Sequence, residues 1–518
     1  MSRLSANEKL ANVAEFLLQS GSDDAPAVVE EDRVFSYRRL REDVERLTSA
    51  LLQRRLRKGA IVGLFSDNSF FFVTAYLAIV RAGLAVCPIP TDASFAIMKE
   101  IFASTRMSHL FIRSKFLKRL GDLDRQCGLT LVTDIRLELG NATETLGELI
   151  ANAADSASPP TIDPNRDLAA VMFTSGSTGR PKGVMVTHKN IRTNTQDIAH
   201  YLSLTAADRV MVALPFYYCF GTSLLHSHLM VGGSVALNNQ FLVPEQVLDG
   251  MVSKNCTNLA GVPSTYQILL RSTSFKQRTF PALRLFQQAG GKLPNALIQE
   301  IRETFPKVKF FVMYGQTEAT ARLSFLPPER LEDKLGSIGR GLPSTSIDVM
   351  KKDGKLVTPG SDEVGEIVAS GGNISPGYLN DPEETAKYFR QGRLHTGDMA
   401  RVDEDGFIFI VDREREFVKS MGHRVSPKEI EEVIAEMPEV VEVVVFGAPD
   451  ELQGEALRAL IVPREPGLIT EDDVRLHCVR ALPNFKVPKS ILFVPSIQKN
   501  NIGKISKSTL KLIYSTAG

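Results

Sequence analysis

The sequence predicts an α/β fold, in which a large N-terminal domain of layered α/β subdomains precedes a small C-terminal domain of α+β type. Short apolar runs alternate along the 518 residues with helical patterns and turn signals, which is typical of stacked sheets and helices. This length is enough for about three domain-sized units. Five charges at 412–416, DRERE, follow an apolar strand pattern, so we expect domains at 1–412 and 413–518.

The first predicted elements are a helix, a strand and a second helix. Ser36 can cap the first helix, because apolar residues recur on one helical face after it. That face consists of Leu40, Val44, Leu47 and Leu51. Residues 61–65 have the pattern of a strand, and the following helix extends to about Arg81, where Gly83 ends it. Strand patterns then recur at 110–112, 130–132 and 169–173.

The composition favours a small-molecule substrate. Lys and Arg number 61 and Asp and Glu number 60, so a net charge of +1 provides no field that would attract nucleic acid or an anionic membrane. The longest apolar stretch, near 70–80, is too short to span a bilayer. Five scattered cysteines without a CxxC pair suggest neither a disulfide framework nor a zinc site. We therefore expect a cytoplasmic protein.

The loop at 174–183, TSGSTGRPKG, carries the chemistry of a phosphate site. It follows an apolar strand pattern, and its glycines and hydroxyls allow backbone and side-chain donors to converge on an anion. Pro181 stands where GxxxxGK[ST] has its second glycine, so the loop differs from that of Ras-like NTPases. A flexible surface loop is the alternative. The predicted phosphate-binding residues are Thr174, Ser175, Gly176, Ser177, Thr178, Gly179 and Lys182.

The loop and the residues after it, TSGSTGRPKGVMVTH, resemble the signature of the adenylate-forming superfamily, which includes acyl-CoA synthetases, nonribosomal peptide adenylation domains and firefly luciferase. Similar motifs follow in order over nearly all the chain. They are LPFYYCFG (214–221), GVPSTY (261–266), QAGGKLP (288–294), YGQTEAT (314–320), GEIVASGGNISPGY (365–378), HTGD (395–398), FVKSMGHRVSPKEIE (417–431) and NNIGKIS (500–506). The resemblance implies an AMP-forming ligase that uses ATP, Mg²⁺ and coenzyme A on a small-molecule carboxylate.

The resemblance implies that YGQTEAT is the centre of the ATP site. Tyr314 would stack on adenine, while two catalytic residues, Thr317 and Glu318, would bond the α-phosphate and hold magnesium. A carboxylate is the hard oxygen ligand that Mg²⁺ prefers. Asp398 of HTGD would accept from both ribose hydroxyls, with Arg413 assisting. The other implied ATP-binding residues are Gly290, Gly291, Gly315 and Gln316.

The segments LPFYYCFG and GVPSTY are similar to those that line the family's acyl pocket. The implied pocket residues are Phe216, Tyr217, Tyr218, Gly221 and Val262. Tyr218 stands where many acyl-CoA synthetases carry histidine, and it should reshape the gate between the acyl pocket and the thiol tunnel. The acyl class therefore stays open. The segment GEIVASGGNISPGY is implied to be a structural loop.

The C-terminal domain is implied to be mobile. Lys504 matches the catalytic lysine, whose charge can bridge the substrate carboxylate and the α-phosphate. Arg415 matches the hinge position, about which the domain would rotate between the two half-reactions. The residues implied to line the coenzyme A tunnel are Lys419, Met421, Gly422 and His423.

Three functions compete on the sequence. The leading one is an acyl-CoA ligase acting on a fatty or aromatic acid. The second is an enzyme that stops at the acyl-adenylate or passes the acyl group to a carrier protein or an amine. The third is a non-catalytic nucleotide-binding relative, which we expect to have lost Glu318 or Lys504. Each residue also has a simpler interpretation when it is taken singly: Tyr314 and residues 216–218 could be core aromatics, and Asp398 could be a solvated carboxylate. The occurrence of all the motifs in order favours an enzyme.

Overall fold

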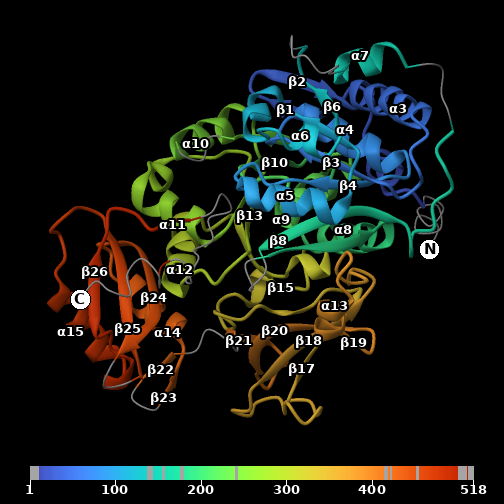
Figure 1. The fold of residues 1–518 in the computed structure, drawn as a ribbon. Helices are drawn as coiled ribbons and strands as arrows, with labels where there is room; N and C mark the ends of the chain where they lie inside the picture. The colour runs from blue at the N-terminus through green and yellow to red at the C-terminus, as the bar shows by residue number, and fades with distance from the viewer. Residues whose placement is uncertain are drawn as a thin grey trace.

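The structure is a computed structural model, and its layers confirm the predicted α/β class (Figure 1). Two large sheets lie in the N-terminal part of the chain, and residues from 418 onward form a smaller unit at one end of the molecule (Figure 1). The described residues are 11–136, 144–153, 158–175, 180–239, 243–413, 418–420, 423–450, 454–499 and 510.

The first large sheet has seven strands in the order β7-β6-β5-β3-β4-β8-β9. Neighbouring strands are parallel except β8 and β9, which form an antiparallel pair. The strands are β3 (Ile61–Phe65), β4 (Ala85–Pro88), β5 (His109–Ile112), β6 (Thr130–Thr133), β7 (Glu144–Thr145), β8 (Leu168–Ser175) and β9 (Pro181–Thr187). The four strand patterns expected in this region therefore lie in one sheet.

The second large sheet has nine strands in the order β16-β15-β14-β13-β12-β10-β11-β1-β2. The six strands from β14 to β1 are parallel, and antiparallel strands close both edges. The strands are β1 (Pro26–Glu30), β2 (Arg33–Ser36), β10 (Arg209–Val212), β11 (Ser234–Leu237), β12 (Asn258–Gly261), β13 (Leu285–Gln288), β14 (Lys309–Tyr314), β15 (Ser324–Leu326) and β16 (Arg340–Gly341).

The predicted first helices are confirmed as α3 (Tyr37–Gln53) and α4 (Phe70–Arg81). The Arg39 amide donates to Ser36 Oγ at 3.3 Å, so Ser36 caps α3 as expected. Helix α4 is buried from Phe70 to Val80, which fits its lack of a polar face. Gly83 follows its end with φ of +72°, a conformation that glycine adopts without strain.

The other N-terminal helices cover or separate the two sheets (Figure 1). They are α2 (Val13–Leu18), α5 (Phe95–Thr105), α6 (Leu123–Gln126), α7 (Leu146–Ala151), α8 (His188–Tyr201), α9 (Cys219–Met230), α10 (Pro244–Ser253), α11 (Pro263–Ser272) and α12 (Asn295–Thr304). Short 3-10 turns are η1 (Ser114–Arg119), η2 (Phe275–Gln277), η3 (Thr317–Ala319), η4 (Pro328–Arg330) and η5 (Asn484–Lys486). Within the described residues, no helix is long and apolar enough to cross a membrane.

A five-stranded sheet connects the large sheets to the C-terminal part. It contains β17 (Thr345–Met350), β18 (Gly365–Gly371), β19 (Phe389–Arg390), β20 (Arg393–Val402) and β21 (Ile408–Arg413), with α13 (Pro382–Tyr388) between β18 and β19. Strand β21 stays in this sheet as far as Arg413. The next hydrophobic core starts at Val418. The boundary between 412 and 413 stays a prediction, since residues 414–417 lie outside the described ones.

The C-terminal part combines a three-stranded sheet, a short hairpin and two helices. Its elements are β22 (Val418–Ser420), β23 (His423–Val425), α14 (Pro427–Ala435), β24 (Val440–Asp450), β25 (Gly454–Pro463), α15 (Glu471–Ala481) and β26 (Ser490–Phe493). Both helices pack on the sheet around Ile430, Val445 and Val474. An ion pair between Lys292 and Glu432 of α14 links this part to the N-terminal part.

Candidate active site

Several predicted motifs meet at one edge of the nine-stranded sheet. The carboxyl ends of parallel strands lie at the same edge, and this is where ligands bind in open α/β sheets. Strand β10 leads into 214–221, β12 into Val262, β13 into Gly290 and β14 into Gly315. The topology therefore brings the implied acyl-pocket and ATP-binding residues to a common edge.

Two of the glycines at this edge permit close approach. Gly290 has φ of +87°, and a Cβ placed there would lie 3.0 Å from Val262 Cγ1. A Cβ on Gly315 would lie only 2.0 Å from the Ala321 carbonyl oxygen, so any other residue would push the loop apart. The backbone of Gly291 is held by a hydrogen bond, because Gln288 Nε2 donates to its carbonyl oxygen at 2.8 Å.

The phosphate loop joins β8 and β9, and its two ends are fixed by their pairing. Thr174 pairs with Lys182, and Ser175 with Pro181, in antiparallel register. Gly176, Ser177, Thr178 and Gly179 lie outside the described residues. The described pairing thus ends at Ser175 and Pro181, and Thr174 and Lys182 face each other one position before this end.

Lys182 lies in a partly enclosed aromatic setting. Its side chain is 10% exposed and forms an ion pair with Glu384 of α13. Its ammonium group also lies 5.4 Å from the centre of the Tyr378 ring and 5.0 Å from that of Tyr388. Lys182 lowers the pKa of Glu384, with a further contribution from Lys387. An anion that binds here would have to compete with the Glu384 carboxylate for this ammonium group.

Tyr378 connects Lys182 to the predicted magnesium ligand. The Tyr378 hydroxyl donates to Glu318 Oε1 at 2.8 Å. Burial, and then the Glu318 carboxylate beside it, raise the pKa of Tyr378, so the hydroxyl stays protonated and continues to donate. Lys182, Tyr378 and Glu318 therefore form one connected cluster, although they come from β9, the segment after β18, and η3.

Thr317 links the ATP motif to the acyl-pocket motif. Its Oγ1 lies 3.4 Å from Sγ of Cys219, the first residue of α9. The following residue, Glu318, is held by its backbone as well, because the Ser375 amide donates to the Glu318 carbonyl oxygen at 2.9 Å. The turn η3 is therefore held by α9, through Cys219, and by the segment after β18, through Ser375.

The predicted adenosine side chains also lie together. The Tyr314 hydroxyl donates to Asp398 Oδ2 at 2.6 Å, and Asp398 is 4% exposed. The Asp398 amide donates to Thr396 Oγ1 at 3.1 Å, which fixes the backbone at this point of β20. Asp398 pairs with Arg413 of β21. The structure thus brings Tyr314 and Asp398 into contact and places the Arg413 backbone beside them.

Phe216, Tyr217 and Val262 of the implied acyl pocket are all buried. Phe216 is fully buried against Phe72, with ring centres 5.3 Å apart, as the core alternative expects. The rings of Tyr217 and Tyr218 lie 4.7 Å apart, and burial raises the pKa of Tyr218. At Gly221 a Cβ would lie 2.1 Å from the Pro215 carbonyl oxygen, so the start of α9 packs tightly on the preceding loop.

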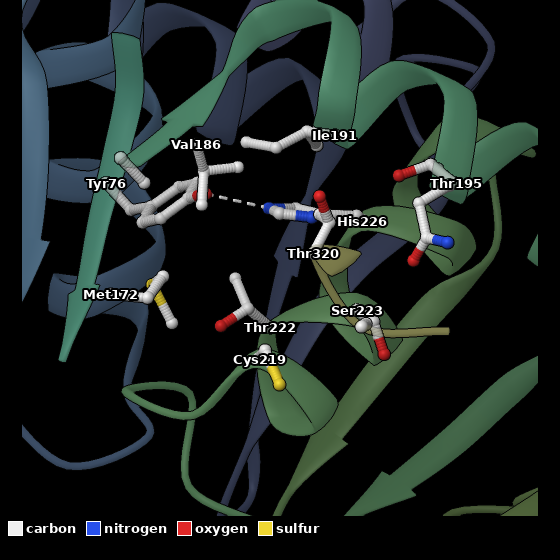
Figure 2. A pocket seen from close by; sticks show the side chains of 13 residues that line it. Tyr76, Met172, Val186, Ile191, Thr195, Cys219, Thr222, Ser223, His226 and Thr320 are labelled. Atoms are coloured by element: carbon white, nitrogen blue, oxygen red, sulfur yellow. Dashed lines mark hydrogen bonds between the residues drawn. The ribbon is translucent and has the colours of Figure 1, made fainter. Parts of the chain in front are cut away.

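A small cavity begins next to this site (Figure 2). Its volume of about 20 Å³ is enough for roughly one water molecule. Figure 2 shows His226 and Tyr76 at one side, where His226 Nε2 lies 2.9 Å from the Tyr76 hydroxyl. Burial lowers the pKa of His226 to about 3, so the ring is neutral. The other lining residues include Asn194 and Thr195 of α8, Cys219, Thr222 and Ser223 of α9, and Thr320 and Ala321.

The predicted C-terminal site residues are only partly described. Lys419 lies on β22 and His423 on β23, and these two strands pair as a hairpin. Met421, Gly422, Arg415 and Lys504 lie outside the described residues. Their implied roles in the tunnel, the hinge and catalysis stay predictions.

The residues present fit a magnesium ion that is held mainly by a bound ligand. Over the described part of the chain, no group of three or more His, Cys, Asp or Glu residues could hold a metal ion. Glu318 is a single carboxylate that accepts from Tyr378, whose ring lies against Lys182 at the end of the phosphate loop. Mg²⁺ commonly binds through one or two carboxylates together with substrate phosphates, so this donor set is consistent with Mg²⁺ bound to ATP.

Sequence reasoning missed Tyr378, Tyr388 and Glu384. Tyr378 closes the motif GEIVASGGNISPGY, which was expected to be a structural loop. The aromatic residue at the end of that motif was the available signal. No local pattern marks Glu384 as the partner of Lys182, because 202 positions separate them.

Comparison with known proteins agrees with this arrangement. Residues 19–379 match the family described as AMP-binding enzyme, and residues 429–504 match the AMP-binding enzyme C-terminal domain. The chain is 30% identical to an oxalate–CoA ligase of Arabidopsis thaliana, over 91% of this chain and 92% of that protein. It is also 30% identical to a long-chain-fatty-acid–CoA ligase of Escherichia coli O157:H7, over 94% and 91%.

Solved structures give the same result. The crystal structure of an anthranilate CoA ligase in complex with anthranoyl-AMP superposes with a TM-score of 0.89 at 25% identity, covering 97% of each chain. The similarity therefore extends over both the N-terminal and the C-terminal parts.

Proposed function

The chain belongs to the AMP-binding enzyme family and is an AMP-forming acyl-CoA ligase, and we propose that the cluster around Glu318 carries its first half-reaction. In that half-reaction a carboxylate oxygen attacks the α-phosphorus of ATP, which gives an acyl-adenylate and pyrophosphate. The coenzyme A thiol then attacks the acyl carbon and AMP leaves. ATP and coenzyme A are thus substrates, and magnesium accompanies the nucleotide.

The observation that carries the proposal is the connection of Lys182, Tyr378 and Glu318. The Tyr378 hydroxyl holds one oxygen of Glu318, and the ring of Tyr378 lies against the Lys182 ammonium group. A carboxylate for magnesium and a cation for phosphate oxygens are therefore joined by one side chain. When bound, the magnesium ion would offset negative charge on the phosphates. Lys182 would turn from Glu384 to those phosphates.

The remaining groups have complementary roles. Thr317 would donate to the α-phosphate, and its contact with Cys219 supports a position between the nucleotide and the acyl group. Tyr314 orients Asp398 through its hydroxyl, and the Asp398 carboxylate would accept from the ribose hydroxyls. Tyr217, Tyr218 and Val262 would border the acyl group. Lys504 would complete the site from the C-terminal domain, at 413–518, with Arg415 as its hinge.

The location and the acceptor complete the proposal. A cytoplasmic location is supported by the five cysteines, none of which forms a disulfide. Coenzyme A is the acceptor. A carrier protein as a further partner stays a prediction.

A single substitution tests the role of Glu318. We expect Glu318→Gln to lower acid-dependent release of pyrophosphate at least about 100-fold, because the amide keeps the shape of the side chain but lacks the charge that holds magnesium. Pyrophosphate release with excess ATP and varied Mg²⁺ measures this effect. The matched control is Glu329→Gln in η4, an exposed carboxylate paired only with Lys309 in the described structure. Equal activity in the two variants would refute the assignment.

A further inference from the structure

The Glu384 carboxylate is shared by two lysines that come from different parts of the chain. Its Oε2 pairs with Lys182 of β9, and its Oε1 accepts from Lys387 at 2.5 Å. The side chain of Lys182 is 10% exposed, whereas that of Lys387, one turn later on α13, is 63% exposed. Water screens an enclosed pair of charges less than an exposed one, so opening the pair with Lys182 has a cost that a bound anion must offset.

The Glu384 side chain starts from a fixed backbone at the beginning of α13. Asp381 caps this helix, and its Oδ1 accepts from the Glu384 amide at 3.0 Å. If Lys182 turns away, Lys387 continues to hold the other carboxylate oxygen. Separation of an enclosed ion pair is most costly when it leaves one charge without a partner. Lys387 lowers this cost for Glu384, and the pair with Lys182 can therefore open while Glu384 stays in place.

Lys182 needs another anion when it leaves Glu384. The faces of the Tyr378 and Tyr388 rings lie 5.4 and 5.0 Å from its ammonium group. A ring face attracts the charge, but it is a weak acceptor for the N–H groups. Lys182 pairs with Thr174 at the end of the phosphate loop, so under the proposed function the nearest anion is the phosphate part of ATP. A lysine is a point charge on a flexible stem and can make this change by rotation of its side chain.

We propose that Glu384 is the counter-ion that Lys182 exchanges for the β- and γ-phosphates of ATP, and that Glu384 takes Lys182 back as pyrophosphate leaves. The proposal rests on the proposed function, because it concerns the nucleotide of that same reaction. Each contact of Lys182 with a phosphate replaces an existing ion pair, so Glu384 weakens the binding of ATP and of pyrophosphate. Weaker binding of the product favours its release. Glu384 is thus a positioning residue that acts through Lys182.

The test compares two nucleotides that differ in the phosphates to which Lys182 would bind. α,β-Methylene-ATP carries β- and γ-phosphates and cannot release pyrophosphate, whereas AMP lacks both phosphates. Titration calorimetry with the full-length enzyme and Mg²⁺ gives the two dissociation constants. We expect Glu384→Gln to bind the ATP analogue about 10-fold more tightly than the wild type and AMP within about twofold of it, because the amide still accepts from Lys182 but carries no charge.

Lys387→Gln gives a second readout of opposite sign. Without Lys387, the Glu384 carboxylate has Lys182 as its remaining partner in the described structure and should hold it more strongly. The ATP analogue should then bind about threefold more weakly than to the wild type. Loosened packing around α13 would weaken binding in both variants. Opposite changes in Glu384→Gln and Lys387→Gln therefore support exchange of the counter-ion, and a loss of affinity in both would overturn it.

The matched control is Glu300→Gln. Glu300 of α12 is also shared by a buried cation, Arg271 at 2.6 Å, and a more exposed one, Lys276 at 2.9 Å. Its substitution should leave both dissociation constants unchanged. The double variant Lys182→Gln, Glu384→Gln should bind the ATP analogue no more tightly than Lys182→Gln alone. Equal affinity of Glu384→Gln and the wild type for the analogue would overturn the inference, whereas a wild type that binds neither nucleotide would count against the proposed function itself.

Discussion

At the residue scale, Tyr378 joins Lys182 to Glu318 in the proposed adenylation site. One side chain offers two different interactions: its hydroxyl donates to Glu318, and its ring face attracts Lys182. Glu384, on the other side of Lys182, supplies the negative charge that balances the lysine. Because the hydroxyl and the ring act separately, a substitution can remove one interaction and keep the other.

Tyr378→Phe removes the hydroxyl and keeps the ring. A hydrogen bond to a charged group contributes about 2 kcal/mol, so we expect acid-dependent release of pyrophosphate to fall about 30-fold. The control is Tyr37→Phe, which removes hydrogen bonds to the Leu229 and Gly233 carbonyl oxygens in the core. That variant should unfold at a lower temperature with unchanged activity per folded molecule. Full activity in Tyr378→Phe would show that Glu318 needs no orientation by this hydroxyl.

At the element scale, local patterns were sufficient for some helices and strands. Ser36 and the apolar face of α3 act over neighbouring residues, and Gly83 ends α4 through its own backbone conformation. The order of strands in the nine-stranded sheet does not follow from local patterns, because β1 pairs with β11, which lies about two hundred residues away in the sequence. That pairing depends on packing of the whole domain, which no local periodicity records.

In the candidate site, too, some features could be predicted from local sequence and others could not. The residues Tyr314, Thr317, Glu318 and Asp398 could be predicted because each lies in a motif that resembles a family signature. The contacts that orient them could not. Tyr378 lies 60 positions from Glu318, and Glu384 lies 202 positions from Lys182.

Three buried histidines predict how stability depends on pH. Burial lowers the pKa of His188 and of His228 to about 4 and that of His226 to about 3, from an ordinary value of 6.5. The unfolded chain binds protons below pH 6.5, while the folded chain stays neutral at these sites until about pH 4. The unfolding free energy should therefore fall as pH drops from 6.5 toward 4, by about 1.4 kcal/mol per pH unit for each histidine.

Urea unfolding between pH 5 and pH 8 measures this dependence. His226→Gln should reduce the pH dependence of the unfolding free energy below pH 6.5 by the contribution of one histidine. The loss of the contact with Tyr76 is measured separately, as the difference in unfolding free energy between variant and wild type above pH 7. An unchanged slope in this variant would contradict the assignment of a neutral buried ring. The exposed residue His200 lies at the end of α8 and provides a matched control, His200→Gln.

At the scale of the whole molecule, the chain forms two bodies with separate cores. The C-terminal core contains residues from Val418 onward. Contacts between the bodies include the Lys292–Glu432 ion pair and a hydrogen bond from Ser426 Oγ to the Val411 carbonyl oxygen at 3.3 Å. In the sequence, the implied adenylation lysine, Lys504, and the implied tunnel residues around Gly422 both fall within 413–518. We therefore propose that the C-terminal body changes position between the two half-reactions, as in other enzymes gated by domain motion.

Lys504→Ala separates the two half-reactions. We expect formation of the acyl-adenylate from ATP to fall at least about 1,000-fold, because the positive charge at the α-phosphate is lost. Thioester formation from synthetic acyl-AMP and coenzyme A should change less than about threefold. Rapid-quench measurements of each step make the comparison. Equal losses in both steps would contradict a role confined to adenylation.

The most direct test of the central claim follows the oxygen atoms of the acid. A substrate labelled with ¹⁸O in its carboxyl group is incubated with the enzyme, ATP, Mg²⁺ and coenzyme A, and the products are analysed by mass spectrometry. Attack of the carboxylate on the α-phosphorus predicts AMP that carries one ¹⁸O atom per acyl-CoA formed. Unlabelled AMP, or ¹⁸O in inorganic phosphate together with ADP, would show that the acid is activated by another route and would contradict the account.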